Sequence, residues 1–314
     1  MQRNLRIVFM GTPDFAVGIL KTLVEHHYNI VGVVTAPDKP AGRGQKLQES
    51  AVKQYAVSQN LSILQPTNLK NLHFLNYLKA LNVNLQIVVA FRMLPKVVWQ
   101  LPEFGTFNLH ASLLPQYRGA APINWAIING DKRTGVTTFF IEEKIDTGEI
   151  ILQESIPIEP NDTAGTLHDK LMVLGSEIVL ETVKLIEYDK VVTISQTTND
   201  LKEAPKIYSE TCQINWNESL ENIQNFIRGL SPYPAAWSIL YQKDQEIKVK
   251  ILKSLPEFSS HSLKSGTVIV SNKTLKIAIK DGYLYVEELQ LAGKKKMDIK
   301  SLLNGFQFSE NAHF

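Results

Sequence analysis

The chain has 314 residues, of which 44% are hydrophobic and 20% are charged, and its formal net charge is +2. These values are ordinary for a globular protein with room for two domains, and they exclude a strongly basic nucleic-acid-binding protein. The single cysteine, Cys212, excludes an intramolecular disulfide and a multi-thiolate metal site, so we expect it to be structural and the compartment to be reducing.

The apolar runs of the chain are all too short to cross a bilayer. The first of them begins at Leu5 and leaves no room before it for a signal or transit peptide. We therefore expect a cytoplasmic protein that does not bind membranes.

The first two-thirds of the chain alternate short β-branched runs with longer helical patterns. The expected strands lie at residues 7–10, 30–34, 85–90, 105–109 and 135–141. The expected helices lie at residues 14–26, 51–59, 71–81 and 166–187. This alternation predicts a Rossmann-like α/β domain over residues 1–190, with a mostly parallel sheet and helices on both faces.

From about Val191 the pattern changes. Residues 193–205 are polar and hold no long periodic run, so we expect a linker at 191–206. A helix at 219–230 is followed by strand-like runs at 247–252, 266–270, 275–279 and 283–289, separated by turn-forming residues. Short strands at this spacing predict a smaller, OB-like β-barrel domain over residues 207–314.

The second part is mildly basic, with 12 basic and 7 acidic side chains between residues 240 and 300. The run Lys294-Lys295-Lys296 contributes to this excess. A lysine run is most often a solvated loop, but a small basic barrel is also suited to RNA phosphates. The charge pattern by itself leaves both interpretations open.

Gly11 follows the first strand and precedes a helix, which is where a dinucleotide-binding loop would lie. The residues after it, Thr12-Pro13-Asp14, lack the further glycines of G-x-G-x-x-G. This disfavours a nicotinamide dehydrogenase. The helix N-terminus can still contact a ligand through backbone N–H groups, or Asp14 can simply face the helix dipole.

A basic, glycine-rich loop at residues 37–47 follows the second strand. It lies where open α/β sheets bind ligands, at the carboxyl ends of the strands. Arg43 and Lys46 are therefore candidates to grip an anionic partner such as RNA. An exposed basic loop without a partner is the alternative.

Residues 107–115 carry the strongest indication of chemistry. We expect a short strand ending in a turn, so that Asn108 and His110 share one face while Phe107 and Leu109 point the other way. An amide and an imidazole side by side at a strand end are suited to stabilising negative charge on a carbonyl oxygen. In isolation, a buried Asn and His satisfied by backbone groups would be the simpler interpretation.

Asp146, in the sequence Asp146-Thr147-Gly148, lies just before another apolar run. A carboxylate at such a strand end can orient an imidazole or accept a proton. A serine hydrolase is disfavoured because G-x-S-x-G is absent and Ser112 precedes what looks like a packed turn.

Together these motifs resemble the folate-dependent formyltransferases, and most closely the branch that acts on methionyl-tRNA. The resemblance covers nearly the whole chain and is most specific in residues 108–123 and 145–148, with further agreement at 7–16, 37–47, 206–207, 214–216 and 227–237. The stretch 227–237 separates this branch from shorter formyltransferases that lack a barrel domain.

The resemblance implies transfer of the formyl group of 10-formyltetrahydrofolate, a co-substrate, to the α-amine of methionyl-initiator tRNA. It implies that Asn108 and protonated His110 stabilise the oxyanion, and that Asp146 holds His110 and assists proton transfer. It also implies folate contacts from Ser112, Leu113, Leu114 and Pro115, and tRNA contacts from Arg43, Lys46 and Lys206. No metal is implied, and we expect a monomer.

Two stretches depart from the family pattern. Residues 48–51 read Gln-Glu-Ser-Ala where a proline-containing segment is expected, and residues 91–93 read Phe-Arg-Met where a Tyr-Gly pair is common. Both lie near the expected binding sites, but neither alters the three catalytic candidates.

Three other functions compete with this one. The first is a formyltransferase acting on an amino sugar nucleotide or glycinamide ribonucleotide, which would not need the barrel. The second is a formyltetrahydrofolate hydrolase, in which water replaces the amine. The third is a non-catalytic RNA-binding protein, which would not need His110.

Overall fold

The computed structural model describes residues 2–41, 46–197 and 199–314. The chain forms two compact units. The first comprises Met1–Gly119, Gly135–Ile156 and His168–Glu203, and the second comprises Ala120–Thr134, Pro157–Leu167 and Ala204–Phe314. Each unit is therefore built from three separate stretches of the chain. The sequence predicts continuous domains instead, with boundaries at 1–190, 191–206 and 207–314, and these boundaries stay a prediction.

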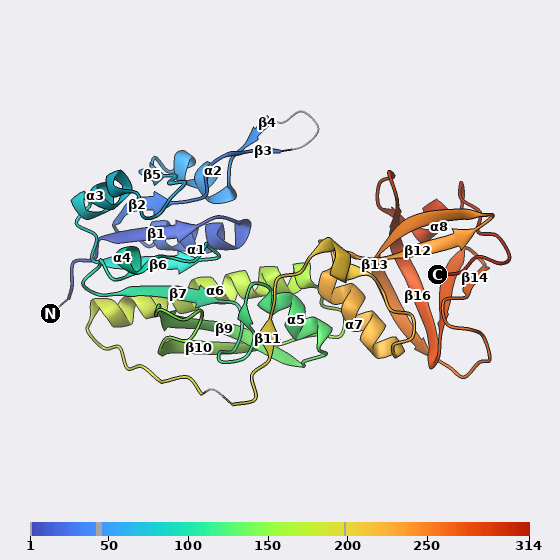
Figure 1. Ribbon diagram of the computed structural model, residues 1–314. Coiled ribbons are helices and arrows are strands. Elements are labelled where there is room, and N and C mark those ends of the chain that lie inside the picture. The colour runs from blue at the N-terminus through green and yellow to red at the C-terminus, as the bar shows by residue number, and fades with distance from the viewer. Residues whose placement is uncertain (1, 42–45, 198) are drawn as a thin grey trace. The chain divides into compact units, whose positions relative to one another are not determined.

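A seven-stranded sheet forms the centre of the first unit, in the order β10-β9-β7-β6-β1-β2-β5 (Figure 1). Strands β5, β2, β1, β6 and β7 run parallel, and β9 is antiparallel to β7. The strands are β1 (Ile7–Gly11), β2 (Ile30–Val34), β5 (Ile63–Leu64), β6 (Leu85–Val89), β7 (Thr106–His110), β9 (Arg133–Phe140) and β10 (Ile150–Pro157). The predicted mostly parallel sheet is therefore confirmed.

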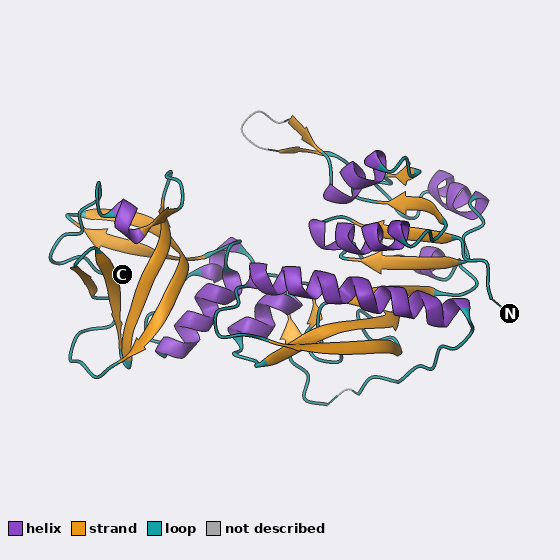
Figure 2. Cartoon of the chain, turned by 180° about the vertical axis from the view of Figure 1, so that it is seen from behind, coloured by secondary structure: helices purple, strands orange, loops and turns teal. Residues whose placement is uncertain are grey.

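Helices cover both faces of this sheet, as predicted. They are α1 (Asp14–Glu25), α2 (Ala51–Ser58), α3 (Leu72–Ala80), α4 (Lys96–Trp99) and α6 (Ala164–Glu187). Helices α1 and α6 lie on one face of the sheet (Figure 2). The ring of Phe15 in α1 is 5.3 Å from that of His168 in α6. On the other face, Val8 and Met10 of β1 pack in one buried cluster with residues of α3 and α4.

The helix boundaries follow local capping. Helix α6 begins two residues before the predicted start at Thr166, because the Thr163 hydroxyl accepts a hydrogen bond from the Thr166 N–H (3.2 Å), as an N-cap residue does. Helix α4 was not predicted, since its four residues are too few to show a helical period.

The predicted loop at residues 37–47 contains a small antiparallel hairpin of β3 (Lys39–Ala41) and β4 (Lys46–Gln48). Its base is tied to α2, because Lys53 pairs with Asp38 (2.5 Å) and Glu49 (2.9 Å). It is also tied to the residue after β5, because Gln65 donates to Asp38. Arg43 lies outside the described residues, and Lys46 is the first residue of β4.

The second unit contains an antiparallel sheet in the order β12-β13-β16-β15-β14, with β17 paired to β16. The strands are β12 (Ala236–Gln242), β13 (Gln245–Phe258), β14 (Val268–Ser271), β15 (Thr274–Ile279), β16 (Gly282–Leu291) and β17 (Met297–Asp298). This all-strand C-terminal domain is confirmed, although β12 was not predicted. Strand β13 runs past the predicted end at Leu252 because it continues through a register shift there.

The expected closure of this sheet into a barrel is not made by strand pairing in the described part of the chain. Instead, residues 312–314 bridge its two edges. At one edge, Tyr241 of β12 exchanges two backbone hydrogen bonds with His313. At the other edge, the Val268 N–H of β14 donates to the Ala312 carbonyl (3.2 Å), and the Phe314 N–H donates to the Gly266 carbonyl (3.0 Å). The sheet is strongly curved (Figure 1).

The remaining elements of the chain are short, apart from α7 (Leu220–Leu230). Its buried residues Leu220, Ile223, Ile227 and Leu230 pack on the sheet of the second unit. Cys212 lies in the same core, fully buried. The others are β8 (Arg118–Gly119), α5 (Pro122–Ile128), β11 (Glu203–Ala204), a 3-10 helix (Ser209–Cys212) and α8 (Ile299–Leu302). No helix in the described ranges has the length and apolar character needed to cross a membrane.

Candidate active site

Strand β7 presents the two candidate oxyanion donors. Leu109 packs toward α6, since a Cβ atom added at Gly175 would lie 2.8 Å from its side chain. Because side chains alternate along a strand, Asn108 and His110 face the opposite side, as predicted from their spacing. Asn108 is half-buried, and in the described part of the chain its amide makes no hydrogen bond. Its donors are therefore open to a substrate.

The His110 ring is buried, and its two nitrogens have different neighbours. Nε2 lies 2.8 Å from the backbone carbonyl oxygen of Tyr117, which can only accept a hydrogen bond, so Nε2 carries a proton. Nδ1 lies 3.9 Å from Oδ2 of Asp146, which is within ion-pair range but too long for a direct hydrogen bond. In the neutral ring, Nδ1 is therefore the acceptor, and in the charged ring it is a second donor facing Asp146.

Asp146 is placed by the loop between β9 and β10. Its φ of 53° lies in the left-handed region, which Asp tolerates better than most residues. The Gly119 N–H donates to Oδ2 of Asp146 (2.9 Å). Two positions on, a Cβ atom at Gly148 would lie only 1.7 Å from the Phe140 carbonyl oxygen, so glycine is required for the loop to close this tightly.

Side chains of β9 and β10 hold the turn that follows β7. The Thr137 hydroxyl of β9 donates to the Ser112 carbonyl (2.6 Å) and accepts from the Leu114 N–H (3.1 Å). Gln153 of β10 donates to the Leu114 carbonyl (2.9 Å). The Ser112 hydroxyl is buried and donates to the Gln116 carbonyl (2.6 Å), so it is already engaged, which supports the interpretation that it is not a nucleophile.

These internal bonds leave an apolar outer surface on the turn. Ser112 and Leu114 are buried, whereas Leu113 and Pro115 are half-buried and present hydrocarbon to solvent. An apolar surface of this kind is suited to packing against a flat ring system.

Comparisons with known proteins identify the family to which the chain belongs. A sequence model described as formyl transferase matches residues 5–183, and a model of the formyl transferase C-terminal domain matches residues 206–307. The chain belongs to the formyl transferase family. This formyl transferase is 60% identical over 310 residues to the methionyl-tRNA formyltransferase of Flavobacterium johnsoniae, and the match covers 98% of each chain. It is 55% identical to the same-named protein of Bacteroides thetaiotaomicron, again over 98% of each chain.

Solved structures show the same fold at lower sequence identity. A sugar 3N-formyl transferase crystallised with dTDP and 5-N-formyl-THF superposes with a TM-score of 0.65 and 22% identity, covering 93% of this chain and all of that one. HypX from Aquifex aeolicus in complex with tetrahydrofolic acid superposes with a TM-score of 0.66 and 16% identity, covering 96% of this chain and 47% of that one.

The three expected tRNA contacts of this formyl transferase are spread over both units. Lys206 is exposed in the second unit, with Nζ 5.2 Å from the centre of the Tyr208 ring. Arg43 falls in the segment 42–45, outside the described residues, and Lys46 begins β4 in the first unit.

Several residues that organise the formyl transferase site were not singled out from the sequence. Tyr117 and Gly119 act through their backbone groups, which leave no side-chain signal, although both lie in the motif 108–123. Thr137 and Gln153 lie on strands, and a single polar residue in a strand carries no pattern that indicates a function. They contact the turn after β7 only in the folded chain.

The two departures from the family pattern have local structural roles. Ser50 is the N-cap of α2, since its hydroxyl accepts from the Lys53 N–H (3.1 Å), and Glu49 pairs with Lys53. Arg92 donates to the carbonyl oxygens of Pro66 and Thr67, so its guanidinium ties two loops of the first unit together.

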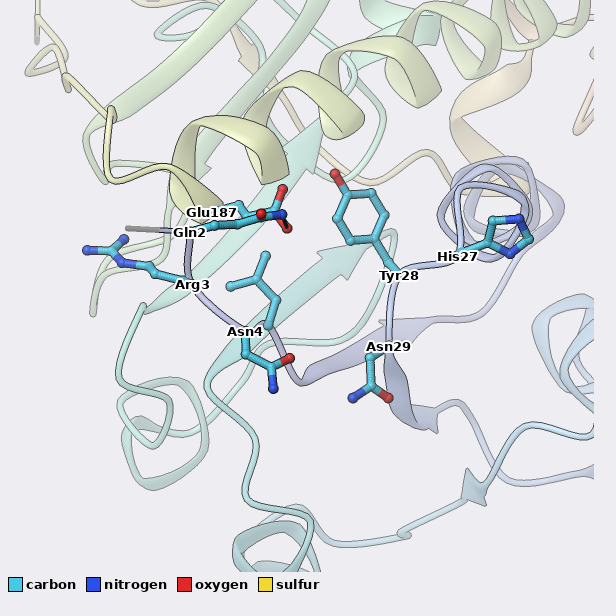
Figure 3. Close-up of a pocket in the computed structure, with 8 residues that line it drawn as sticks. Gln2, Arg3, Asn4, His27, Tyr28, Asn29 and Glu187 are labelled. Carbon is cyan, nitrogen blue, oxygen red and sulfur yellow. Dashed lines mark hydrogen bonds between the residues drawn. The ribbon is translucent and has the colours of Figure 1, made fainter.

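A cavity of about 380 Å³ lies away from this site (Figure 3). It is lined by Gln2, Arg3, Asn4, Leu5, His27, Tyr28, Asn29 and Glu187. These residues precede β1, precede β2 or end α6, so the cavity opens at the amino ends of the parallel strands. His110 is the last residue of β7, at the carboxyl ends of the parallel strands, so it lies at the opposite end from the cavity.

Among the described residues, no group of three or more His, Cys, Asp or Glu could hold a metal ion.

Proposed function

We propose that this chain transfers the formyl group of 10-formyltetrahydrofolate to the α-amine of methionyl-initiator tRNA. The observation that carries the proposal is the 60% identity to a methionyl-tRNA formyltransferase over 98% of both chains. Both family domains are present in this chain, over residues 5–183 and 206–307. We further propose that the protein is cytoplasmic, monomeric, and divided into a catalytic domain (1–190), a linker (191–206) and a tRNA-binding domain (207–314).

The bound folate supplies an electrophilic formyl carbon, and the protein stabilises the negative charge that develops on the formyl oxygen when the amine attacks. The Asn108 amide is free to donate to that oxygen. A charged His110 donates through Nδ1, because its Nε2–H is committed to the Tyr117 carbonyl. Oxyanion donors of this kind each contribute roughly 10²–10³-fold to the rate.

Proton transfer falls to His110 and Asp146. The substrate ammonium loses one proton to become the attacking amine and a second when the amide forms. One of these protons must reach N10 of the leaving folate, and the other is released. Asp146 can accept the first proton from the ammonium, since its carboxylate is held by the Gly119 N–H beside the His110 ring. Nδ1 of His110 lies 3.9 Å from Oδ2 of Asp146, so the carboxylate is within ion-pair range of the imidazole. General acid–base catalysis of this kind contributes on the order of 10²–10⁴-fold.

We also assign the residues that bind the folate and the tRNA. We assign the folate wall to Ser112, Leu113, Leu114 and Pro115, because that turn adjoins the two donors and presents an apolar surface. We assign phosphate contacts to Lys206 and contacts with the acceptor end of the tRNA to Arg43 and Lys46.

The experiment that tests the proposal measures formyl transfer from 10-formyltetrahydrofolate to methionyl-initiator tRNA, with methionyl-elongator tRNA and no tRNA as parallel reactions. Formylation of the initiator alone is the expected result. Folate release without tRNA would instead identify a hydrolase, and inactivity in all three reactions, followed by activity on an amino sugar nucleotide, would identify a sugar formyltransferase.

A further inference from the structure

Gln196 lies in the polar stretch that the sequence presents as a linker, yet its side chain contacts the loop that carries Asp146. Its Nε2 donates to the backbone carbonyl oxygens of Asp146 (3.0 Å) and Gly148 (2.7 Å). Its Oε1 accepts from Nε (3.2 Å) and Nη2 (2.6 Å) of Arg118. All four groups belong to the first unit, and the half-buried amide is fully engaged at both ends.

These four hydrogen bonds fix the orientation of the Gln196 amide. If it were flipped, its oxygen would face two carbonyl oxygens and its NH₂ group would face the guanidinium of Arg118. Gln196 therefore holds the backbone on both sides of Thr147, in the only orientation that the neighbouring groups allow.

Arg118 connects this clamp to the rest of the catalytic set. The residue before it, Tyr117, accepts the hydrogen bond from His110, and the residue after it, Gly119, donates to Asp146. Three consecutive residues thus hold the imidazole, the carboxylate and, through Gln196, the carboxylate's loop. A shift of that loop would change the 3.9 Å separation between His110 and Asp146.

The stretch around Gln196 is itself anchored on both sides. Ile194 exchanges two backbone hydrogen bonds with Ile150 (2.8 and 2.9 Å), and the Tyr117 N–H donates to the Lys202 carbonyl (2.6 Å). The side chain of Thr193 also donates to Glu149 (2.5 Å). Gln196 is therefore presented to the loop by a segment held before and after it.

We propose that Gln196 is a positioning residue for formyl transfer, which holds the Asp146 loop in register with His110 through its bonds to Asp146, Gly148 and Arg118. The inference deepens the proposed function and rests on it. It requires hydrogen-bond donation to the loop, and not merely the volume of the side chain.

The test compares Gln196→Glu with Gln196→Ala. Gln196→Glu keeps the volume and the contact with Arg118 but replaces the NH₂ donor with an oxygen that faces two carbonyls. Both variants are expected to lower kcat by about 10- to 100-fold, since misplacement of a catalytic group by about 1 Å costs of this order. The KM values for folate and tRNA should change less than about threefold, because the role proposed for Gln196 is to position the loop and not to bind a ligand. Gln100→Glu, an exposed change on the same unit, is the matched control.

Hydrogen exchange of residues 142–149 provides a readout that does not depend on activity. Faster exchange in Gln196→Glu, with Gln100→Glu unchanged, is expected if the loop loses its clamp. Wild-type kcat in Gln196→Glu together with unchanged exchange would overturn the inference. If the wild-type protein itself does not formylate methionyl-tRNA, the proposed function fails, and the exchange result still decides whether Gln196 holds the loop.

Discussion

His110 Nε2 lies 2.8 Å from the carbonyl oxygen of Tyr117, while its Nδ1 lies 3.9 Å from Oδ2 of Asp146. A backbone carbonyl thus fixes which ring nitrogen is protonated in the neutral form, and leaves the other to face the carboxylate. The sequence predicted that Asp146 would hold His110. In the structure the Tyr117 carbonyl holds Nε2, and the Asp146 carboxylate lies nearest to the other nitrogen, Nδ1.

The first prediction concerns these two side chains. His110→Ala should lower kcat for formyl transfer by about 10²–10⁴-fold, because it removes an oxyanion donor and a proton carrier. Asp146→Asn should cause a loss of similar size, since the amide cannot accept a proton although it keeps the shape. Steady-state kinetics with initiator tRNA measure both, and exposed His73→Ala is the control. Wild-type turnover in His110→Ala would exclude the proposed role.

The second prediction concerns the tight closure of the Asp146 loop. Gly148→Ala places a Cβ atom 1.7 Å from the Phe140 carbonyl oxygen, so the loop must move. We expect kcat to fall at least about tenfold and the unfolding free energy to fall by on the order of 1–3 kcal/mol. Gly305→Ala is the control, because a Cβ atom there meets nothing within 4 Å. Equal kinetics and equal melting for both variants would show that the loop can relax without cost.

The third prediction separates tRNA binding from chemistry. Lys206→Ala should weaken tRNA binding and reduce the slope of log K against log salt by about 1, as expected when one phosphate contact is lost. Its folate KM should stay unchanged. Filter binding at several salt concentrations measures the slope, with Lys79→Ala, an exposed lysine of the first unit, as the control. An unchanged slope would remove Lys206 from the tRNA interface.

The fourth prediction concerns Cys212. Burial raises the pKa of its thiol, and its Sγ–H donates to the Tyr208 carbonyl (3.1 Å), so at pH 8 the reactive thiolate is scarce in the folded protein. A thiol reagent should therefore label the native protein far more slowly than the urea-unfolded protein, while Cys212→Ala gives the unlabelled baseline. Equal labelling rates would mean that this part of the core opens freely.

The fifth prediction concerns the base of the β3–β4 hairpin. Hydrogen bonds from Lys53 and Gln65 hold the pKa of Asp38 below its ordinary value. A lowered folded-state pKa contributes stability that is present above the unfolded pKa and is lost as pH falls through the folded value. Asp38→Asn should therefore have a lower melting temperature than the wild-type protein between about pH 5 and 8. This difference in melting temperature should become smaller in more acidic buffer, below the unfolded Asp pKa of about 3.9. A gap that is the same at every pH would show that the ionised carboxylate is not the cause.

The fold of the first unit was predictable because its strands and longer helices carry strong local periods. The predicted strand at residues 30–34 matches β2, and the prediction for α1 differs by one residue. Errors occurred where the local signal was weak or interrupted, as in the short α4, the unpredicted β12 and the register shift in β13.

The sequence also predicted only part of the arrangement of the catalytic candidates. The two-residue period of a strand was sufficient to place Asn108 and His110 on one face. Nothing in the sequence identified the carbonyl of Tyr117, because every residue has one, or the side chain of Gln196, which meets Arg118 across 78 positions of chain. Which distant groups become neighbours is decided by the packing of the sheet and its loops, so the support of the site is visible only in the folded structure.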